Sequence, residues 1–265
     1  MTMFEIDIVT LFPEFFDSPL KQSLLKRAQA DGLVKIRVHD LRSWAKDKHQ
    51  TVDDSPFGGG PGMVFKVEPM YECLKEVGAG AWKVLLDAHG ELLTPKAAED
   101  LSKKKKIVLI AGHYEGVDYR IKEHLVDQMV SVGNFITMGG EAPALCLIEA
   151  LTRFIPGVLG NEESIVAESF SGNGLLEYPQ YTRPREFNGW EVPEVLFSGN
   201  HAEVKKWRDR AALEATKKNR PDLLHVSSAL LAQPEKKQRQ QSLKAKAPQT
   251  NKKSFKKMNK EKEHE

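Results

Sequence analysis

Two short apolar runs with a helical segment between them constrain the fold of this chain more than any other feature. Residues 83–87 (KVLLD) and 106–112 (KIVLIAG) are apolar on both faces, which is typical of strands covered by helices on both sides. Residues 95–105 between them predict a helix. Because a crossover helix joins strands that run in the same direction, this order predicts a parallel pair.

The same alternation continues along the first two thirds of the chain. Strand-like runs at 4–11 and 34–39 alternate with helical patterns at 19–30, 68–77 and 141–154. This order predicts an α/β fold with a mainly parallel sheet. Ligands of such sheets bind beyond the carboxyl ends of the strands. We expect one pocket there, formed by three polar or glycine-containing loops that follow strands, at 87–90, 112–116 and 133–140.

Residues 53–63 (DDSPFGGGPGM) have a composition from which we expect neither a helix nor a strand to form. Four glycines and two prolines fall within Pro56–Met63, directly after two aspartates. The spacing is neither the G-x-G-x-x-G of a dinucleotide site nor that of a phosphate loop. A flexible linker is one interpretation. The flanking apolar residues Phe57, Met63 and Phe65 favour a shaped loop that approaches a ligand.

Composition places the chain among globular proteins. It has 265 residues, of which 40% are hydrophobic and 29% charged, enough for one or two domains with a full core. The longest apolar run, 107–111, is too short to span a bilayer, and residues 1–10 carry Glu5 and Asp7 in place of a signal sequence. Two cysteines show no metal-ligand spacing. We therefore expect a cytoplasmic protein that has no membrane-spanning segment and no metal site formed by its side chains alone.

Composition also divides the chain. We expect a sheet domain at 1–160, a polar linker at 161–172 and a small, mostly helical domain at 173–234, with a basic helix at 202–218. Residues 235–265 are rich in Lys, Gln and Ser; from Gln233 onward the chain carries 11 Lys and Arg against 4 Asp and Glu. This tail is expected to be disordered. It is either a solubilising extension or a basic arm that holds RNA.

Several blocks of sequence, in one order, resemble the bacterial tRNA (guanine-N1)-methyltransferase family over about residues 4–230. The blocks are LFPEFF at 11–16, TVDDSPFGGGPGM at 51–63, GHYEGVD at 112–118, SVGNFITMGGEAPAL at 131–145, RFIPGVLGNEES at 153–164, GLLEYPQYTRP at 174–184 and LFSGNHAEVKKWR at 196–208. The resemblance implies a knotted SPOUT-type sheet domain and a homodimer with active sites at its interface. It also implies transfer of a methyl group from S-adenosyl-methionine to N1 of the guanine at tRNA position 37.

Guanine N1 carries a proton, so its methylation calls for a base at N1 and a cation near O6. The resemblance assigns the cation to Arg153 and the base to Glu168, where the family typically has Asp. It gives Glu115 as the rival base or a magnesium ligand, since family activity is linked to Mg²⁺. Without the resemblance, Arg153 could be a helix C-terminal cation, Glu168 a solvated linker charge and Glu115 a structural cap.

The methyl donor needs no acid or base, so glycines and backbone groups suffice to hold it. The resemblance assigns the donor site to Ala88, Gly112, Val132, Gly133, Asn134, Phe135, Ile136, Thr137, Gly139 and Gly140. His113, Ala88, Asn134 and Met138 depart from the residues usual in the family.

RNA contacts require cations directed at phosphates and aromatic side chains for stacking. The resemblance places the target base against Asp53, Gly58, Gly59, Gly60 and Gly62. It places the remaining tRNA contacts on Tyr181, Arg183, Asn200, His201, Lys205 and Arg208. A basic helix is by itself often only a solvated face.

Two other functions remain open at the level of sequence. The chain could methylate ribose 2′-hydroxyls with the same knotted fold, or it could bind tRNA without catalysis because Glu168 no longer works. Ribose methylation would not need an acidic group that reads guanine, and a binding protein would not turn over.

Overall fold

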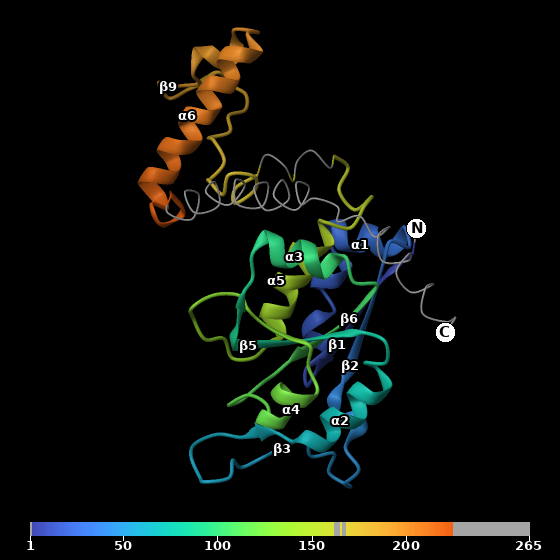
Figure 1. The fold of residues 1–265 in the computed structure, drawn as a ribbon. Coiled ribbons are helices and arrows are strands. Elements are labelled where there is room, and N and C mark those ends of the chain that lie inside the picture. The colour runs from blue at the N-terminus through green and yellow to red at the C-terminus, as the bar shows by residue number, and fades with distance from the viewer. Residues whose placement is uncertain (1, 162–164, 166–167, 225–265) are drawn as a thin grey trace, which may run out of the picture. The chain divides into compact units, whose positions relative to one another are not determined.

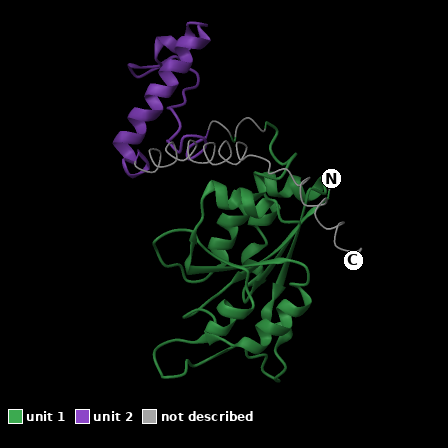
Figure 2. Cartoon of the chain, viewed as in Figure 1, with its two compact units in different colours: residues 1–165 green, residues 166–265 purple. Residues whose placement is uncertain are grey.

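The computed structural model describes residues 2–161, 165 and 168–224. The chain divides into two compact units, residues 1–165 and 166–265 (Figure 2). The tail expected to be disordered, 235–265, lies outside the described residues.

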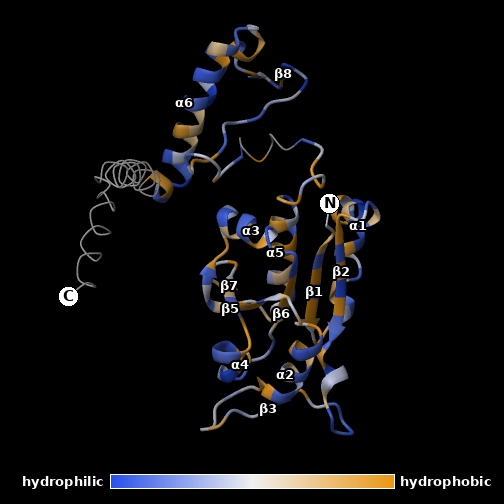
Figure 3. Ribbon diagram, turned by 45° about the vertical axis from the view of Figure 1, so that its right-hand side comes forward, coloured by the Kyte–Doolittle hydropathy of each residue, from blue (hydrophilic) through white to orange (hydrophobic). Residues whose placement is uncertain are grey.

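The first unit is built on a five-stranded sheet in the order β2-β1-β6-β5-β7 (Figure 1). All its pairs are parallel. The strands are β1 (Phe4–Thr10), β2 (Val34–Asp40), β5 (Trp82–Leu92), β6 (Lys106–Ala111) and β7 (Gln128–Ser131). Apolar colour runs along β1 in Figure 3, as expected of a strand in the middle of the sheet. The predicted α/β class and parallel sheet are confirmed; the knot stays a prediction.

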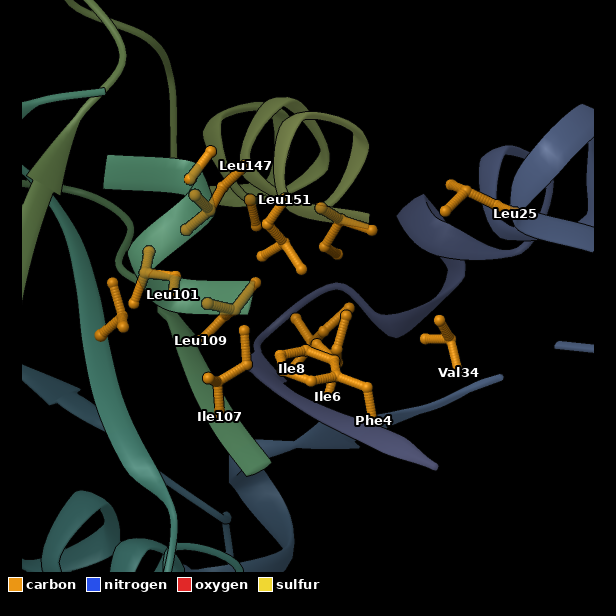
Figure 4. Packing of buried hydrophobic residues seen from close by; sticks show 14 of the residues in the cluster. Phe4, Ile6, Ile8, Leu25, Val34, Leu101, Ile107, Leu109, Leu147 and Leu151 are labelled. Carbon is orange, nitrogen blue, oxygen red and sulfur yellow. The ribbon is translucent and has the colours of Figure 1, made fainter. Parts of the chain in front are cut away.

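Helices cover both faces of this sheet, as the apolar runs predicted. On one face α1 (Ser23–Ala30), α3 (Pro95–Ser102) and α5 (Glu141–Thr152) pack on β1 and β6 through residues such as Leu101, Leu147 and Ile107 (Figure 4). On the other face α2 (Val67–Glu76) and α4 (Tyr119–His124) bury Met70 and Ile121 against the sheet. Apolar packing on both faces is typical of the parallel sheets of α/β proteins.

Two expectations about local structure were wrong. The loop expected at 87–90 lies inside β5, which continues to Leu92 after a register shift between Leu86 and Glu91 against β7. Residues Asp53–Asp54 form β3, paired antiparallel with β4 (Val64–Phe65), so only the glycine-rich part between them is a loop. Cross-strand hydrogen bonds outweigh local composition in both places, since they satisfy backbone groups that composition does not record.

The second unit is helical only in part. Its long helix α6 (His201–Asn219) confirms the basic helix expected at 202–218, and a 3₁₀ turn precedes it at Glu194–Phe197. A two-stranded hairpin joins β8 (Glu186–Phe187) to β9 (Trp190–Glu191). The backbone amide of Leu176 donates to the hydroxyl of Thr216, which is buried in α6, and so ties the preceding segment to this helix.

A charged cluster is buried in the sheet at Asp7 of β1. Its carboxylate accepts hydrogen bonds from Arg37 Nε at 2.6 Å and lies 2.7 Å from His39 Nε2, while Lys106 Nζ lies 3.5 Å away. Burial by itself would raise the pKa of this carboxyl. The hydrogen bonds and charges of Arg37 and His39 outweigh that effect and hold the pKa well below its usual range.

We expect Asp7→Asn to lower the free energy of unfolding at pH 7 by about 3 kcal/mol, because Arg37 loses its buried partner. The native state binds fewer protons than the unfolded chain, so the Asp7 contribution is complete above about pH 4 and disappears as pH falls further. Denaturant titrations between pH 7 and pH 3 should show a weaker pH dependence for the variant. Glu5→Gln, which changes the more exposed partner of Arg37, is the control and should cost less.

Candidate functional site

A cleft of about 380 Å³ opens at the carboxyl ends of β6 and β7 and beside the middle of β5. Its walls come from three segments that are far apart in the sequence, as the parallel sheet predicts. The lining residues are Leu85–Ala88, Gly112–Val117, Val130–Val132, Ile136–Gly140 and Pro143. The predicted convergence of the three segments on one pocket is therefore confirmed, although the first of them is a strand.

Most residues predicted to hold the donor face this cleft. Ala88, Gly112, Val132, Ile136, Thr137, Gly139 and Gly140 line it. Gly133, Asn134 and Phe135 belong to the same loop but are not among the lining residues; Asn134 and Phe135 are exposed.

Close backbone contact between two loops forms the floor of the cleft. The amide of Gly140 donates to the carbonyl oxygen of Gly112 at 2.6 Å, and His113 pairs with Gly139 across an antiparallel bridge. A Cβ on Gly140 would lie 2.7 Å from Ala111 Cα, closer than carbon atoms can approach. Glycine is required at 140 because no side chain fits between the two segments.

Glu115 is an exposed carboxylate on the wall of the cleft. Its backbone amide donates to the carbonyl oxygen of Met63 at 3.0 Å, and the preceding residue Tyr114 has a positive φ of 56°. Among the described residues, no hydrogen bond or ion pair of the Glu115 side chain is found. A carboxylate that is not committed to a protein partner is available to a substrate.

The glycine-rich loop is joined to the same wall. The amide of Phe65 donates to the carbonyl oxygen of Gly116, and the amide of Asp118 donates to that of Phe65. The loop residues predicted to bind the target base, Asp53, Gly58, Gly59, Gly60 and Gly62, do not line the cleft. Gly62 lies next to the Glu115 side chain, since a Cβ added at Gly62 would be 2.5 Å from Glu115 Cγ.

Asp87 is the second acid of the cleft, and its charge is already compensated. Lys122 Nζ of α4 lies 2.7 Å from Asp87 Oδ2, and the two side chains are only 13% and 11% exposed. Burial would raise the pKa of Asp87, but Lys122 and the amide and ring of His89 more than offset it and lower the pKa. This pair ties β5 to the helix that follows the Glu115 loop.

Glu141 is a buried acid that the sequence interpretation missed. The Thr10 hydroxyl donates to Glu141 Oε1 at 2.8 Å, and His113 Nδ1 lies 3.6 Å from Glu141 Oε2. His113 Nδ1 is itself buried and has no hydrogen-bond partner among the described residues, and the His113 ring packs on Phe12 with ring centres 4.8 Å apart. A charged residue opening the apolar helix α5 was the available signal, but Thr10 is 131 residues away.

Arg153, another of the predicted catalytic residues, is not among the residues that line the cleft. Arg153 follows the last residue of α5, whose 12 residues span roughly 18 Å from the cleft end of the helix. Glu168 is half-buried and belongs to the second unit. Within one copy of the first unit, the structure therefore does not bring Arg153 and Glu115 together.

The second unit has a cavity of about 370 Å³ between α6 and the segment 178–197. Aromatic and arginine side chains line much of it: Tyr178, Tyr181, Phe197, Trp207, Arg183, Arg185 and Arg208. The Arg208 guanidinium lies 4.6 Å from the Tyr178 ring centre and that of Arg185 lies 4.1 Å from Phe197. Three of the residues predicted to contact tRNA, Tyr181, Arg183 and Arg208, therefore line one cavity. Asn200, His201 and Lys205 do not line it, and contact of any of the six with tRNA stays a prediction.

The described part of the chain lacks two features that would bear on function. That part of the chain has no group of three or more His, Cys, Asp or Glu side chains arranged to hold a metal ion. It also has no helix with the length and apolar character that crossing a bilayer requires.

A parallel α/β sheet with a glycine-rich cleft at its carboxyl ends, and a free carboxylate on the wall, defines an enzyme-like protein with a small-molecule site. The tRNA (guanine-1)-methyltransferase family model matches residues 4–226, and the chain belongs to this family. The family predicted from the sequence blocks is thereby confirmed.

Relatives from several bacteria carry the name tRNA (guanine-N(1)-)-methyltransferase. The protein of Geotalea uraniireducens (strain Rf4) is 48% identical over 231 residues, which cover 85% of this chain and 93% of the relative. The protein of Geobacillus kaustophilus (strain HTA426) is 50% identical over 222 residues, which cover 83% of this chain and 91% of that relative. The protein of Dictyoglomus turgidum is 48% identical over 227 residues, which cover 85% of this chain and 92% of that relative.

We expect Lys122→Met to lower the free energy of unfolding by roughly 3 kcal/mol, since it leaves the Asp87 carboxylate buried without its cation. Asp87→Asn combined with Lys122→Met removes both charges and should recover at least half of that loss. Denaturant unfolding of the single and double variants measures both values. Losses that simply add in the double variant would contradict a coupled pair.

Proposed function

We propose that this protein transfers a methyl group from S-adenosyl-methionine to N1 of the guanine at position 37 of tRNA. The observation that carries the proposal is the glycine-rich cleft, formed by the family's sequence blocks in a chain about half identical to relatives named for guanine-N1 methylation of tRNA. No feature of the cleft favours ribose methylation, and its uncommitted acid supports catalysis over binding alone.

The cleft fits the donor in its chemistry. Its lining is mostly glycine, backbone and apolar side chains, and a Cβ on Gly112 would meet only Val117, 3.6 Å away, so this backbone borders open space. We assign donor binding to Ala88, Gly112, Val132, Gly133, Asn134, Phe135, Ile136, Thr137, Gly139 and Gly140. When bound, S-adenosyl-methionine supplies an electrophilic methyl group on a sulfonium. The residues around it need only bind and orient.

The acid–base chemistry belongs to the guanine. In the proposed mechanism the Glu168 carboxylate removes the N1 proton, and the Arg153 guanidinium donates to O6, where negative charge develops. Glu115 lies on the cleft wall beside the donor and is the second candidate for the base.

Magnesium, if it takes part, needs oxygen ligands beyond this chain. Of the two acids among the described residues that line the cleft, Asp87 pairs with Lys122 and Glu115 is not held by a protein cation. Mg²⁺ sites commonly combine one or two carboxylates with water and substrate oxygens. Glu115 together with RNA oxygens would satisfy that pattern.

The distance between Arg153 and the cleft supports a homodimer. Arg153 stands at the far end of α5 from Gly140, which lines the cleft, and Glu168 lies in the second unit. In a dimer, Arg153 and Glu168 of one copy can act at the cleft of the other copy. We propose that each site takes its donor cleft from one subunit and these two residues from the other.

The second unit would hold the tRNA. Its cavity offers aromatic rings and planar guanidinium groups, the surfaces on which unstacked bases and phosphates bind. Around it, α6 carries Lys205, Lys206, Arg208 and Arg210 on a helix whose surface is largely exposed. Asn200 caps this helix through the amide of Glu203.

Single-turnover methylation of an unmodified tRNA transcript, followed by nucleoside mapping, tests the function. We expect N1-methylguanosine at position 37, whereas a 2′-O-methylated nucleoside or no product would contradict the proposal. Glu168→Gln keeps the size but removes the basicity, so the methyl-transfer rate should fall by on the order of 10²- to 10⁴-fold with little change in binding. Glu168→Asp should retain most of the rate. If Glu115→Gln abolishes transfer while Glu168→Gln does not, the base is Glu115.

Mixed dimers test the shared site. Gly112→Val should fill the donor cleft, and Arg153→Ala should remove the cation, so each homodimer should be inactive. A dimer of one chain of each kind contains one intact cleft facing one intact Arg153 if the subunits share sites. We expect about half of the wild-type activity per dimer. An inactive mixed dimer would show that each chain supplies its own Arg153.

A further inference from the structure

The Glu115 carboxylate faces the cleft without a hydrogen bond to hold it. The described residues include no side chain or backbone donor bonded to its oxygens, although its own backbone amide donates a hydrogen bond to the carbonyl oxygen of Met63. An exposed glutamate with free rotation populates several rotamers, which a reaction at a defined atom would not tolerate. Something other than hydrogen bonding must limit where this carboxylate lies.

Gly62 of the glycine-rich loop supplies that limit. A Cβ on Gly62 would lie 2.5 Å from both Cγ and Oε1 of Glu115 and 2.9 Å from Cδ. Carbon atoms in contact are normally 3.5–4.0 Å apart, so the glutamate side chain occupies the space that any other residue at 62 would fill. Because Cγ is close to the fixed backbone, the conflict cannot be relieved by moving the carboxylate tip alone.

The other glycines of the loop do not make such a contact. A Cβ on Gly58 or Gly59 would meet no atom within 4 Å, and one on Gly60 would only reach Pro56 at 4.0 Å. Gly59 and Gly62 both have φ of +78°, a backbone conformation that glycine favours. Conformational freedom therefore explains both residues, but only Gly62 is also required by the position of Glu115.

We propose that Gly62 is a positioning residue for the reaction: by having no side chain, it lets the glycine-rich loop pack against Glu115 and hold its carboxylate toward the cleft. The proposal rests on the function proposed above, in which Glu115 is the second candidate for the base and a candidate ligand of Mg²⁺. It gives the loop a role in catalysis that does not require a loop side chain to touch the substrate.

Gly59→Ala and Gly62→Ala form a matched pair for testing it. Both substitutions place Ala at the same positive φ in the same exposed loop, so both carry the same backbone cost, and only Gly62→Ala displaces Glu115. We expect single-turnover methyl transfer by Gly62→Ala to be about 10- to 100-fold slower than by Gly59→Ala, since small misplacements of a reacting group cost this much. Donor affinity and melting temperature should be alike in the two variants.

The same pair in a Glu115→Ala background decides whether the effect passes through Glu115. With the glutamate side chain gone, the ratio of the two rates should fall to about one. A ratio near one with Glu115 present, or an undiminished ratio without it, would overturn the proposal. So would wild-type activity in Glu115→Ala itself.

Crystal structures of the two variants provide a readout that does not depend on activity. We expect Glu115 to leave its present position in Gly62→Ala and to keep it in Gly59→Ala; an unmoved Glu115 in Gly62→Ala overturns the proposal. The wild-type methylation assay separates this outcome from failure of the proposed function. An active wild type with equal variants contradicts only the role of Gly62, whereas a wild type that makes no N1-methylguanosine contradicts the function.

Discussion

The close approach of Gly139–Gly140 to Ala111–His113 is the constraint on which the rest of the site depends. The hydrogen bond from Gly140 to Gly112 joins the end of β6 to the start of α5, so the loops after β6 and β7 share one cleft. The sheet alone would only place these loops at the same edge. Side chains are excluded at this contact, which is why backbone and glycine form so much of the cleft surface.

Two acids near the cleft, Asp87 and Glu141, already have internal partners. Asp87 is held by Lys122, and Glu141 accepts from Thr10 and faces His113. A cleft that held several free carboxylates would bind the sulfonium of a donor tightly but would stabilise its charge, which methyl transfer must dissipate. On the proposed function, Glu115 is the acid among the described cleft residues that stays available to the guanine.

The α/β class and the parallel sheet could be predicted from the sequence, because burial on both faces of a sheet requires continuous apolar runs that are visible in the sequence. Apolar runs such as 106–112 and the amphipathic helices predict their own structure and, through their order, parallel pairing. The extension of β5 through Asp87–Gly90 has no such run in the sequence, since it depends on pairing with β7 across a register shift. The partners of Asp87 and Glu141 were missed for the same reason: Lys122 and Thr10 are distant in sequence, and no periodicity connects them.

The separation of the predicted catalytic residues suits a reaction that must wait for its second substrate. The cleft is formed within one first unit, whereas Arg153 stands about one helix length away and Glu168 belongs to the second unit. On the proposed function, a bound donor therefore meets a base and a cation only when subunits and RNA are assembled around the guanine. Assembly of a catalytic site by the correct substrate costs some catalytic power but gains specificity. Because a methyl donor reacts with many nucleophiles, the gain in specificity outweighs the loss of catalytic power: the donor meets the base only when the guanine that accepts the methyl group is also bound.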